Sequence, residues 1–173
     1  MNSSNFKEIS LVVLILILAF SRLIPHPPNF TPLLGMAVFA GAMFDRKTFA
    51  FIVPLAAMAL SDLFIGFHSG MMIIYLAIAV NVCIGFLLAS KFSYTKSFFA
   101  LISGSLVFYI ITNFAVWAGS TFYSQDMNGL ISCYIMALPF LQNTLLSTIL
   151  YGTGAFLLFN QFEKKALLLT KNS

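Results

Sequence analysis

The sequence predicts an all-α integral membrane protein, a single domain over residues 1–173 built as one bundle of six transmembrane helices. Of its 173 residues, 60% are hydrophobic and 8% are charged. A soluble domain usually carries about 25% charged residues, so this chain has too few to cover a water-exposed surface. Helices are expected because each segment inside lipid must satisfy its own backbone hydrogen bonds.

Six apolar runs give the expected spans, since a helix needs about 20 residues to cross a bilayer. The runs cover residues 9–24, 32–44, 48–67, 71–90, 97–118 and 135–160. The first lacks a small-x-small cleavage site, so we expect a retained helix and not a signal peptide. For the second we expect Thr31 as the N-cap and Pro32 as the first helical residue. The sixth lies within residues 130–162 and could begin afresh near Pro139.

The lysines and arginines predict the topology. With six spans, all of them except Arg22 fall on one side of the membrane, namely Lys7, Arg46, Lys47, Lys91, Lys96, Lys164, Lys165 and Lys171. The second run is about 20 Å of helix and could instead be re-entrant, but Arg46 and Lys47 would then change sides, against the positive-inside rule. We therefore expect six spans with both termini cytoplasmic. The formal charge of +4 is then a topology signal and indicates no nucleic-acid partner.

A proline-rich strip, residues 22–32, separates the first two runs on the outer side. Four of the six prolines lie between Pro25 and Pro32. Proline fixes φ and lacks an N–H, so the strip cannot continue the preceding helix. In a chain that is otherwise nearly all apolar, a stiff polar strip must lie at an interface or line a cavity. We expect Arg22, His26 and Asn29 to form one wall of an outward-facing ligand pocket.

Asp62 lies inside the third run, where a carboxylate costs about 2.5–3.5 kcal/mol on insertion scales unless it faces the bundle interior. Arg22 is expected at a similar depth, near the outer end of the first helix. The two could form an ion pair that stabilises the bundle, or one or both could contact a polar or charged substrate. These alternatives are compatible, because a pair can open when a ligand arrives.

His26 and His68 are expected to flank this region from two loops. Hydrogen bonding to a ligand is favoured over metal ligation, because no His-x-x-x-His or Cys-x-x-Cys spacing and no carboxylate cluster accompanies them. Plain interfacial polarity is the third alternative. The identity of any metal stays open, and histidine would make either role sensitive to pH between about 5 and 8.

Asn113 and Trp117 close the fifth run. The tryptophan and the tyrosines that follow could form an interfacial aromatic belt. Alternatively, they could cover a pocket in which Asn113, Gln142 and Asn143 are buried hydrogen-bonding groups. The predicted ligand-binding set is therefore Arg22, His26, Asn29, Asp62, His68, Asn113 and Trp117.

Ala37 and Gly41 are small residues one helical turn apart in the second run. This spacing lets another helix approach closely. Packing inside the bundle is one interpretation, and docking of a separate membrane subunit is the other.

Motifs for catalysis are absent from the sequence. It holds no Gly-rich phosphate loop, no Gly-x-Ser-x-Gly and no His-Glu-x-x-His. We therefore expect neither an enzyme nor a cofactor, and no ATP hydrolysis by the chain itself.

Three segments carry a resemblance that covers nearly the whole chain. They are Arg22-Leu-Ile-Pro-His-Pro-Pro-Asn-Phe-Thr-Pro32, the tract Pro54-Leu-Ala-Ala-Met-Ala-Leu-Ser-Asp62-Leu-Phe-Ile-Gly-Phe-His68, and Asn113-Phe-Ala-Val-Trp117 followed by Cys133-Tyr-Ile-Met-Ala-Leu-Pro-Phe140. Together they resemble an uncharacterised bacterial family of small membrane proteins described as transport proteins. More remotely, the chain is similar to the S components of energy-coupling-factor vitamin transporters, including the solitary cobalamin S component.

The resemblance implies a six-helix substrate-capture subunit that binds a small vitamin-like or metal-containing ligand at its outer face. Most S components depend on a transmembrane coupling subunit with ATPases, and Ala37 and Gly41 would be the corresponding docking face. We therefore expect a transport protein of the lipid bilayer with a small-molecule substrate. The alternative is a non-transporting membrane scaffold or accessory subunit.

Overall fold

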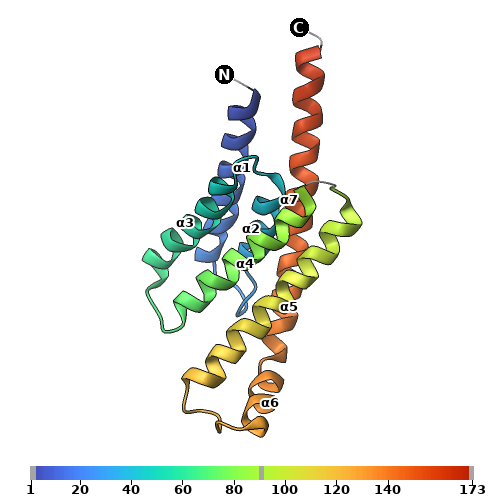
Figure 1. Ribbon diagram of the computed structural model, residues 1–173. Coiled ribbons are helices and arrows are strands. Elements are labelled where there is room, and N and C mark those ends of the chain that lie inside the picture. The colour runs from blue at the N-terminus through green and yellow to red at the C-terminus, as the bar shows by residue number, and fades with distance from the viewer. Residues whose placement is uncertain (1–2, 90–91, 172–173) are drawn as a thin grey trace.

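The computed structural model describes residues 3–89 and 92–171, with side chains described for 7–89 and 92–163. The described residues form helices and no strand. In order, the elements are α1 (Ser3–Phe20), the 3-10 turn η1 (Ser21–Leu23), α2 (Leu33–Met43), α3 (Lys47–Ile65), α4 (Met71–Ala89), α5 (Tyr94–Gly119), α6 (Met127–Met136) and α7 (Leu138–Lys171). The first helix begins and the last ends at the same end of the bundle, while α6 lies at the opposite end (Figure 1).

Four of the described helices are long and apolar enough to cross a membrane. They are α3, α4, α5 and the Leu138–Glu163 part of α7. The expectation of an all-helical, membrane-type protein is thus confirmed. The helices α2 and α6 are apolar but shorter, so the number of six spans remains a prediction.

The short helix α2 is the centre of the bundle. Every residue from Leu33 to Gly41 is buried, as expected for a helix that is apolar on all faces. It contacts α1, α3, α4, α5 and α7, and Figure 1 shows it enclosed by them. The Phe39 ring packs edge-on against Phe156 and Phe159 of α7, with ring centroids 5.1 and 5.8 Å apart. The core of the protein is therefore organised around an element of about 17 Å, at 1.5 Å per residue.

The closest helix contact joins α2 to α4 through two glycines. A Cβ on Gly41 would lie 2.1 Å from the Val82 carbonyl oxygen, and one on Gly85 would lie 2.2 Å from that of Val38. The two backbones touch, which only glycine permits at this distance. Ala37 is fully buried as well. The structure therefore assigns Ala37 and Gly41 to packing inside the chain, and they offer no free surface for docking a partner.

Several helix ends differ from the sequence expectation. Helix α1 ends at Phe20, not Ile24, and Arg22 lies in η1, since Pro25 holds the preceding Ile24 in an extended conformation. Thr31 is not the N-cap of α2; Pro32 takes that position without a side-chain cap bond.

The last apolar run also divides differently. The expected span over 135–160 crosses a break, because α6 ends at Met136 and α7 begins at Leu138. The predicted fresh start near Pro139 is confirmed, and proline suits this place because a first helical turn needs no N–H from it.

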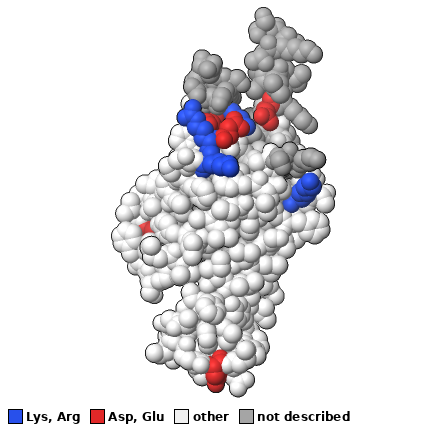
Figure 2. Space-filling view, viewed as in Figure 1, with Lys and Arg blue, Asp and Glu red and all other residues white. Residues whose placement is uncertain are grey.

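Ion pairs fasten the start of α1 to the link between α2 and α3. Lys7 Nζ lies 2.9 Å from Asp45 Oδ1, and Arg46 Nε lies 3.7 Å from Glu8 Oε1. The Lys and Arg atoms that can be seen in Figure 2 lie toward the end where α1 begins. The chain therefore returns to this end after α2, as the charge pattern predicts.

Substituting Gly41 tests the α2–α4 contact. Gly41→Ala forces its Cβ against the Val82 carbonyl, so we expect a loss of about 1–3 kcal/mol or more in unfolding free energy. Thermal unfolding in detergent, followed by circular dichroism, measures it. The matched control is Gly154→Ala in α7, where a Cβ meets no atom within 4 Å, and it should leave stability unchanged or slightly raised. Equal stability of the two variants would contradict the packing.

Candidate functional site

Arg22 and Asp62 form an ion pair between η1 and α3. Arg22 Nη1 lies 2.9 Å from Asp62 Oδ1, and it also donates to Ser61 Oγ at 2.6 Å. Asp62 is fully buried, and the Arg22 side chain is 12% exposed. The predicted pair is therefore present, and it is shielded from solvent.

The third member of this cluster is Tyr75 of α4. Its hydroxyl donates to Asp62 Oδ2 at 3.0 Å, so both carboxylate oxygens have a partner. A buried carboxylate is tolerated only when it is paired and hydrogen-bonded. The pair therefore joins η1, α3 and α4, and its two charges cancel.

Two buried polar atoms close to this cluster have no hydrogen-bond partner within the described part of the chain. They are Arg22 Nε and Thr148 Oγ1. Buried polar groups in native proteins nearly always have a partner, and each exception calls for a reason. Both residues line the same cavity, although these two atoms are themselves covered.

The arginine cavity, as we call it, has a volume of about 230 Å³. The proline-rich strip supplies Arg22, His26, Asn29 and Thr31, and α7 supplies Thr144, Ser147 and Thr148. The remaining lining residues come from α2, α3, α4 and α5: Leu33, Leu34, Met58, Ile74, Ile78 and Phe108. This cavity is therefore polar along two walls and apolar along the others.

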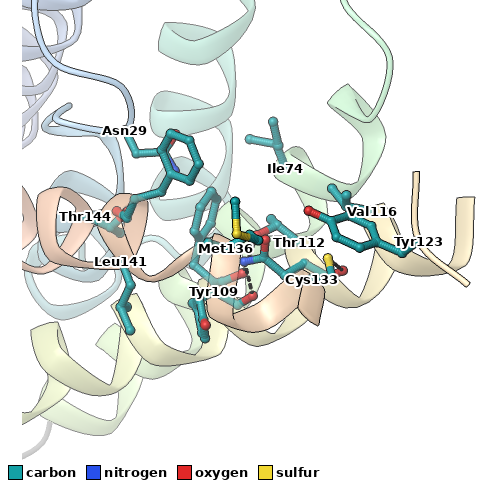
Figure 3. Close-up of a pocket in the computed structure, with 14 residues that line it drawn as sticks. Asn29, Ile74, Tyr109, Thr112, Val116, Tyr123, Cys133, Met136, Leu141 and Thr144 are labelled. Carbon is teal, nitrogen blue, oxygen red and sulfur yellow. Dashed lines mark hydrogen bonds between the residues drawn. The ribbon is translucent and has the colours of Figure 1, made fainter. Parts of the chain in front are cut away.

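The aromatic cavity adjoins it and has a volume of about 330 Å³. Its lining comes from the strip, α4, α5, the α5–α6 link, α6 and α7: Asn29, Ile74, Phe108, Tyr109, Thr112, Asn113, Val116, Tyr123, Cys133, Met136, Ala137, Phe140, Leu141 and Thr144. Figure 3 shows Asn29 and Thr144 at one end, and Val116 and Tyr123 at the other. Asn29, Ile74, Phe108 and Thr144 line both cavities, so the two adjoin.

Side chains of α7 hold the strip in place as a wall. Asn143 Nδ2 donates to the Pro28 carbonyl at 2.9 Å, and Ser147 Oγ donates to that of Asn29 at 3.4 Å. Asn29 itself has a φ of 61°, in the left-handed region that asparagine tolerates better than most residues. The predicted rigid wall is therefore present, and its anchors are on α7.

The structure brings together five of the seven predicted ligand-binding residues. Arg22, His26 and Asn29 line the arginine cavity, Asp62 lies behind Arg22, and Asn113 lines the aromatic cavity. His26 Nδ1 lies 2.6 Å from the Ile24 carbonyl, which can only accept. Nδ1 therefore donates this hydrogen bond.

His68 and Trp117 do not line either cavity. His68 is exposed in the α3–α4 link, with Nδ1 2.9 Å from the Ser69 carbonyl. Trp117 Nε1 donates to the Ser124 carbonyl at 3.0 Å and closes the α5–α6 link. Gln142, expected to be buried, is exposed. Sequence position alone could not give the direction of these side chains.

Sequence reasoning missed Tyr75 and the hydroxyl face of α7. Thr144, Ser147 and Thr148 are buried and follow the i, i+3, i+4 spacing of one helix face, which was the available signal. Tyr75 had no such signal, because its role depends on how the α3–α4 hairpin folds. Among the described side chains, no three His, Cys, Asp or Glu residues lie together as a metal site would require.

The α5–α6 link, which carries Tyr123 to the aromatic cavity, depends on Asp126. Asp126 caps α6, accepting from the Gly129 amide and from the Ser124 hydroxyl, each at 2.8 Å. These two hydrogen bonds hold the pKa of Asp126 below its usual value of 3.8. The link is therefore tightest when Asp126 is ionised.

One family matches the chain: a family of unknown function, DUF6580, over residues 2–169. No curated protein and no solved structure matches the chain significantly.

Breaking the ion pair tests its structural role. Asp62→Ala or Arg22→Met alone leaves a buried charge without its partner, so each should cost about 3–5 kcal/mol. The double variant removes both charges and should lose much less than the sum of the two. Thermal unfolding in detergent of the four proteins gives the coupling. Additive losses would contradict a coupled pair.

Acidification tests the Asp126 cap. Because the folded pKa lies below the unfolded value, the stabilisation is present above pH 3.8 and is lost as the pH falls through the lower, folded value. Trp117, the only tryptophan in the sequence, bonds to the same link, so its fluorescence should change in that acid range. Asp126→Asn keeps a capping side chain that does not titrate, and it should abolish the transition. An unchanged transition in this variant would contradict the assignment.

Proposed function

Because the chain belongs to DUF6580, a family of unknown function, we propose its function from the site: it is a membrane transport protein that captures a small ligand in the joined cavities. The observation that carries the proposal is the pair of adjoining cavities, one of which is lined by Arg22 and by the hydroxyl-bearing residues of α7. Polar side chains on its walls can bind a polar group of a small ligand, while the apolar walls bury the rest of the molecule.

The size of the cavities supports a small-molecule ligand. At about 230 and 330 Å³, they adjoin and together fall within the range of about 300–1,000 Å³ typical of ligand pockets. Their walls combine a few polar groups with a larger apolar area, as such pockets generally do.

We propose six membrane passes, with α1 and α2 completing the four long helices and both termini in the cytoplasm. Lys7, Arg46 and Lys47 near the start of α1 support this orientation under the positive-inside rule. The cavities then open to the outer face of a bacterial inner membrane. The sequence has no ATP-binding loop, so the energy for release would come from a separate coupling subunit with ATPases, as in vitamin transporters.

Native mass spectrometry of protein purified in mild detergent tests the capture role. We expect a retained small molecule on the wild type and its loss from Arg22→Ala, which removes the guanidinium group from the cavity wall. Lys96→Gln, an exposed change remote from the cavities, is the matched control and should retain the ligand.

Two outcomes would contradict capture. A ligand-free wild type with a stably attached protein subunit would instead support a scaffold or accessory role. If Arg22→Ala is destabilised but retains the ligand as the wild type does, the Arg22–Asp62 pair stabilises the fold and does not bind the ligand.

A further inference from the structure

We propose, building on the capture role, that Asn29 determines which ligand the joined cavities bind. Its carboxamide pairs with a ligand edge that carries an N–H donor next to a carbonyl or ring-nitrogen acceptor. The ligand is then a flat cyclic amide or a related nitrogen heterocycle, and its ring packs against Phe108.

Asn29 lies where the two cavities meet, since it lines both of them, together with Ile74, Phe108 and Thr144. Ile74 and Phe108 are apolar, and the Thr144 hydroxyl donates to the Phe140 carbonyl at 2.7 Å. Asn29 is exposed, and its carboxamide has no hydrogen-bond partner among the residues that the structure describes. In Figure 3 its side chain extends from the strip toward the other lining residues. Asn29 therefore presents a free polar group at the junction.

Other polar side chains of the aromatic cavity already donate hydrogen bonds within the chain. Thr112 and Asn113 each donate to the carbonyl one helical turn earlier in α5, at 2.8 Å. The Tyr109 hydroxyl donates to the Tyr134 carbonyl at 2.5 Å. A ligand would have to compete with these bonds, whereas the Asn29 carboxamide is available without breaking any.

The Asn29 backbone is held in one conformation. Its φ of 61° lies in the left-handed region, and its carbonyl accepts from the Thr31 amide at 3.1 Å and the Ser147 hydroxyl at 3.4 Å. Pro27 and Pro28 precede it, and proline fixes its own φ. The carboxamide is thus presented from a stiff segment, so less conformational entropy is lost when a ligand binds.

The chemistry of the ligand follows from the carboxamide, which carries a donor and an acceptor side by side. A ligand that displaces water from this group must replace both hydrogen bonds to keep its affinity. An edge with an adjacent donor and acceptor does so with two parallel bonds, as asparagine does with adenine in DNA. Planar amides and nitrogen heterocycles have such an edge. Phe108, which also lines both cavities, can pack against their rings.

Two probes of nearly the same shape test the pairing. Isoindolinone has an N–H next to its carbonyl, and indanone has a CH₂ in place of that N–H. Binding to the full chain in nanodiscs is measured by thermal shift and calorimetry. Because both probes share the carbonyl, the ratio of their affinities isolates the bond from the ligand N–H to Asn29 Oδ1. This ratio should be about tenfold higher in the wild type than in Asn29→Gly, the factor that one net hydrogen bond gives.

Two variants separate the acceptor of the carboxamide from its donor. Asn29→Gly removes both and keeps the backbone, since glycine adopts a positive φ readily. Asn29→Asp keeps an acceptor and loses the donor, and aspartate also tolerates this φ. In Asn29→Asp both probes should bind more weakly, while the ratio stays at least as high as in the wild type. Lys96→Gln, an exposed change remote from the cavities, is the control and should keep the wild-type ratio.

An equal ratio in the wild type and Asn29→Gly overturns the proposal, as does a ratio in Asn29→Asp that falls to the level expected of Asn29→Gly. The second comparison stands even if Asn29→Gly does not fold. Absence of binding by both probes also overturns it.

Native mass spectrometry separates this role from capture itself. If the wild type retains a ligand and Asn29→Gly retains it undiminished, capture stands and the role of Asn29 fails. If the wild type retains no ligand and binds neither probe, both fail.

Discussion

The ion pair between Arg22 and Asp62 is the interaction on which the half of the bundle away from the start of α1 depends. A charge in the apolar interior is tolerated only with its counter-charge and with further hydrogen bonds, and here Ser61 and Tyr75 supply those bonds. Because its members come from η1, α3 and α4, the pair fixes three elements relative to one another. It also holds the Arg22 side chain in the wall of the arginine cavity.

The position of the cavities follows from how tightly the rest of the bundle is packed. Around α2, the contact between Gly41 and Gly85 brings two backbones together and leaves no space for a ligand. Toward the other end, the proline-rich strip replaces helix with extended chain, and α5, α6 and the start of α7 continue beyond it (Figure 1). Close packing therefore ends where the strip begins, and the space between the strip and these helices forms the two cavities.

Much of the fold followed from composition and periodicity. The apolar runs gave the long helices, and proline placed the C-terminal end of α1 and the start of α7 to within a few residues. The errors came from local alternatives of similar energy: Pro32 takes the cap position expected for Thr31, and the last run breaks at Ala137. Within the site, Arg22 and Asp62 were predictable because buried charges must find each other, whereas Tyr75 and Thr148 were not, since their roles depend on packing between distant segments.

By itself, the sequence determined that this is a helical, membrane-type chain with its basic residues toward one end and its polar strip toward the other. These properties follow from the free energy of transferring side chains between water and lipid. Each residue contributes to that free energy nearly independently of the others. Only the tertiary structure decided that Ala37 and Gly41 are covered by the chain's own helices, that His68 and Trp117 do not line the cavities, and that Arg22 Nε and Thr148 Oγ1 are left without partners. Those facts depend on the relative rotation of packed helices, which a hydrophobic pattern constrains only to a face and never to a single side-chain direction.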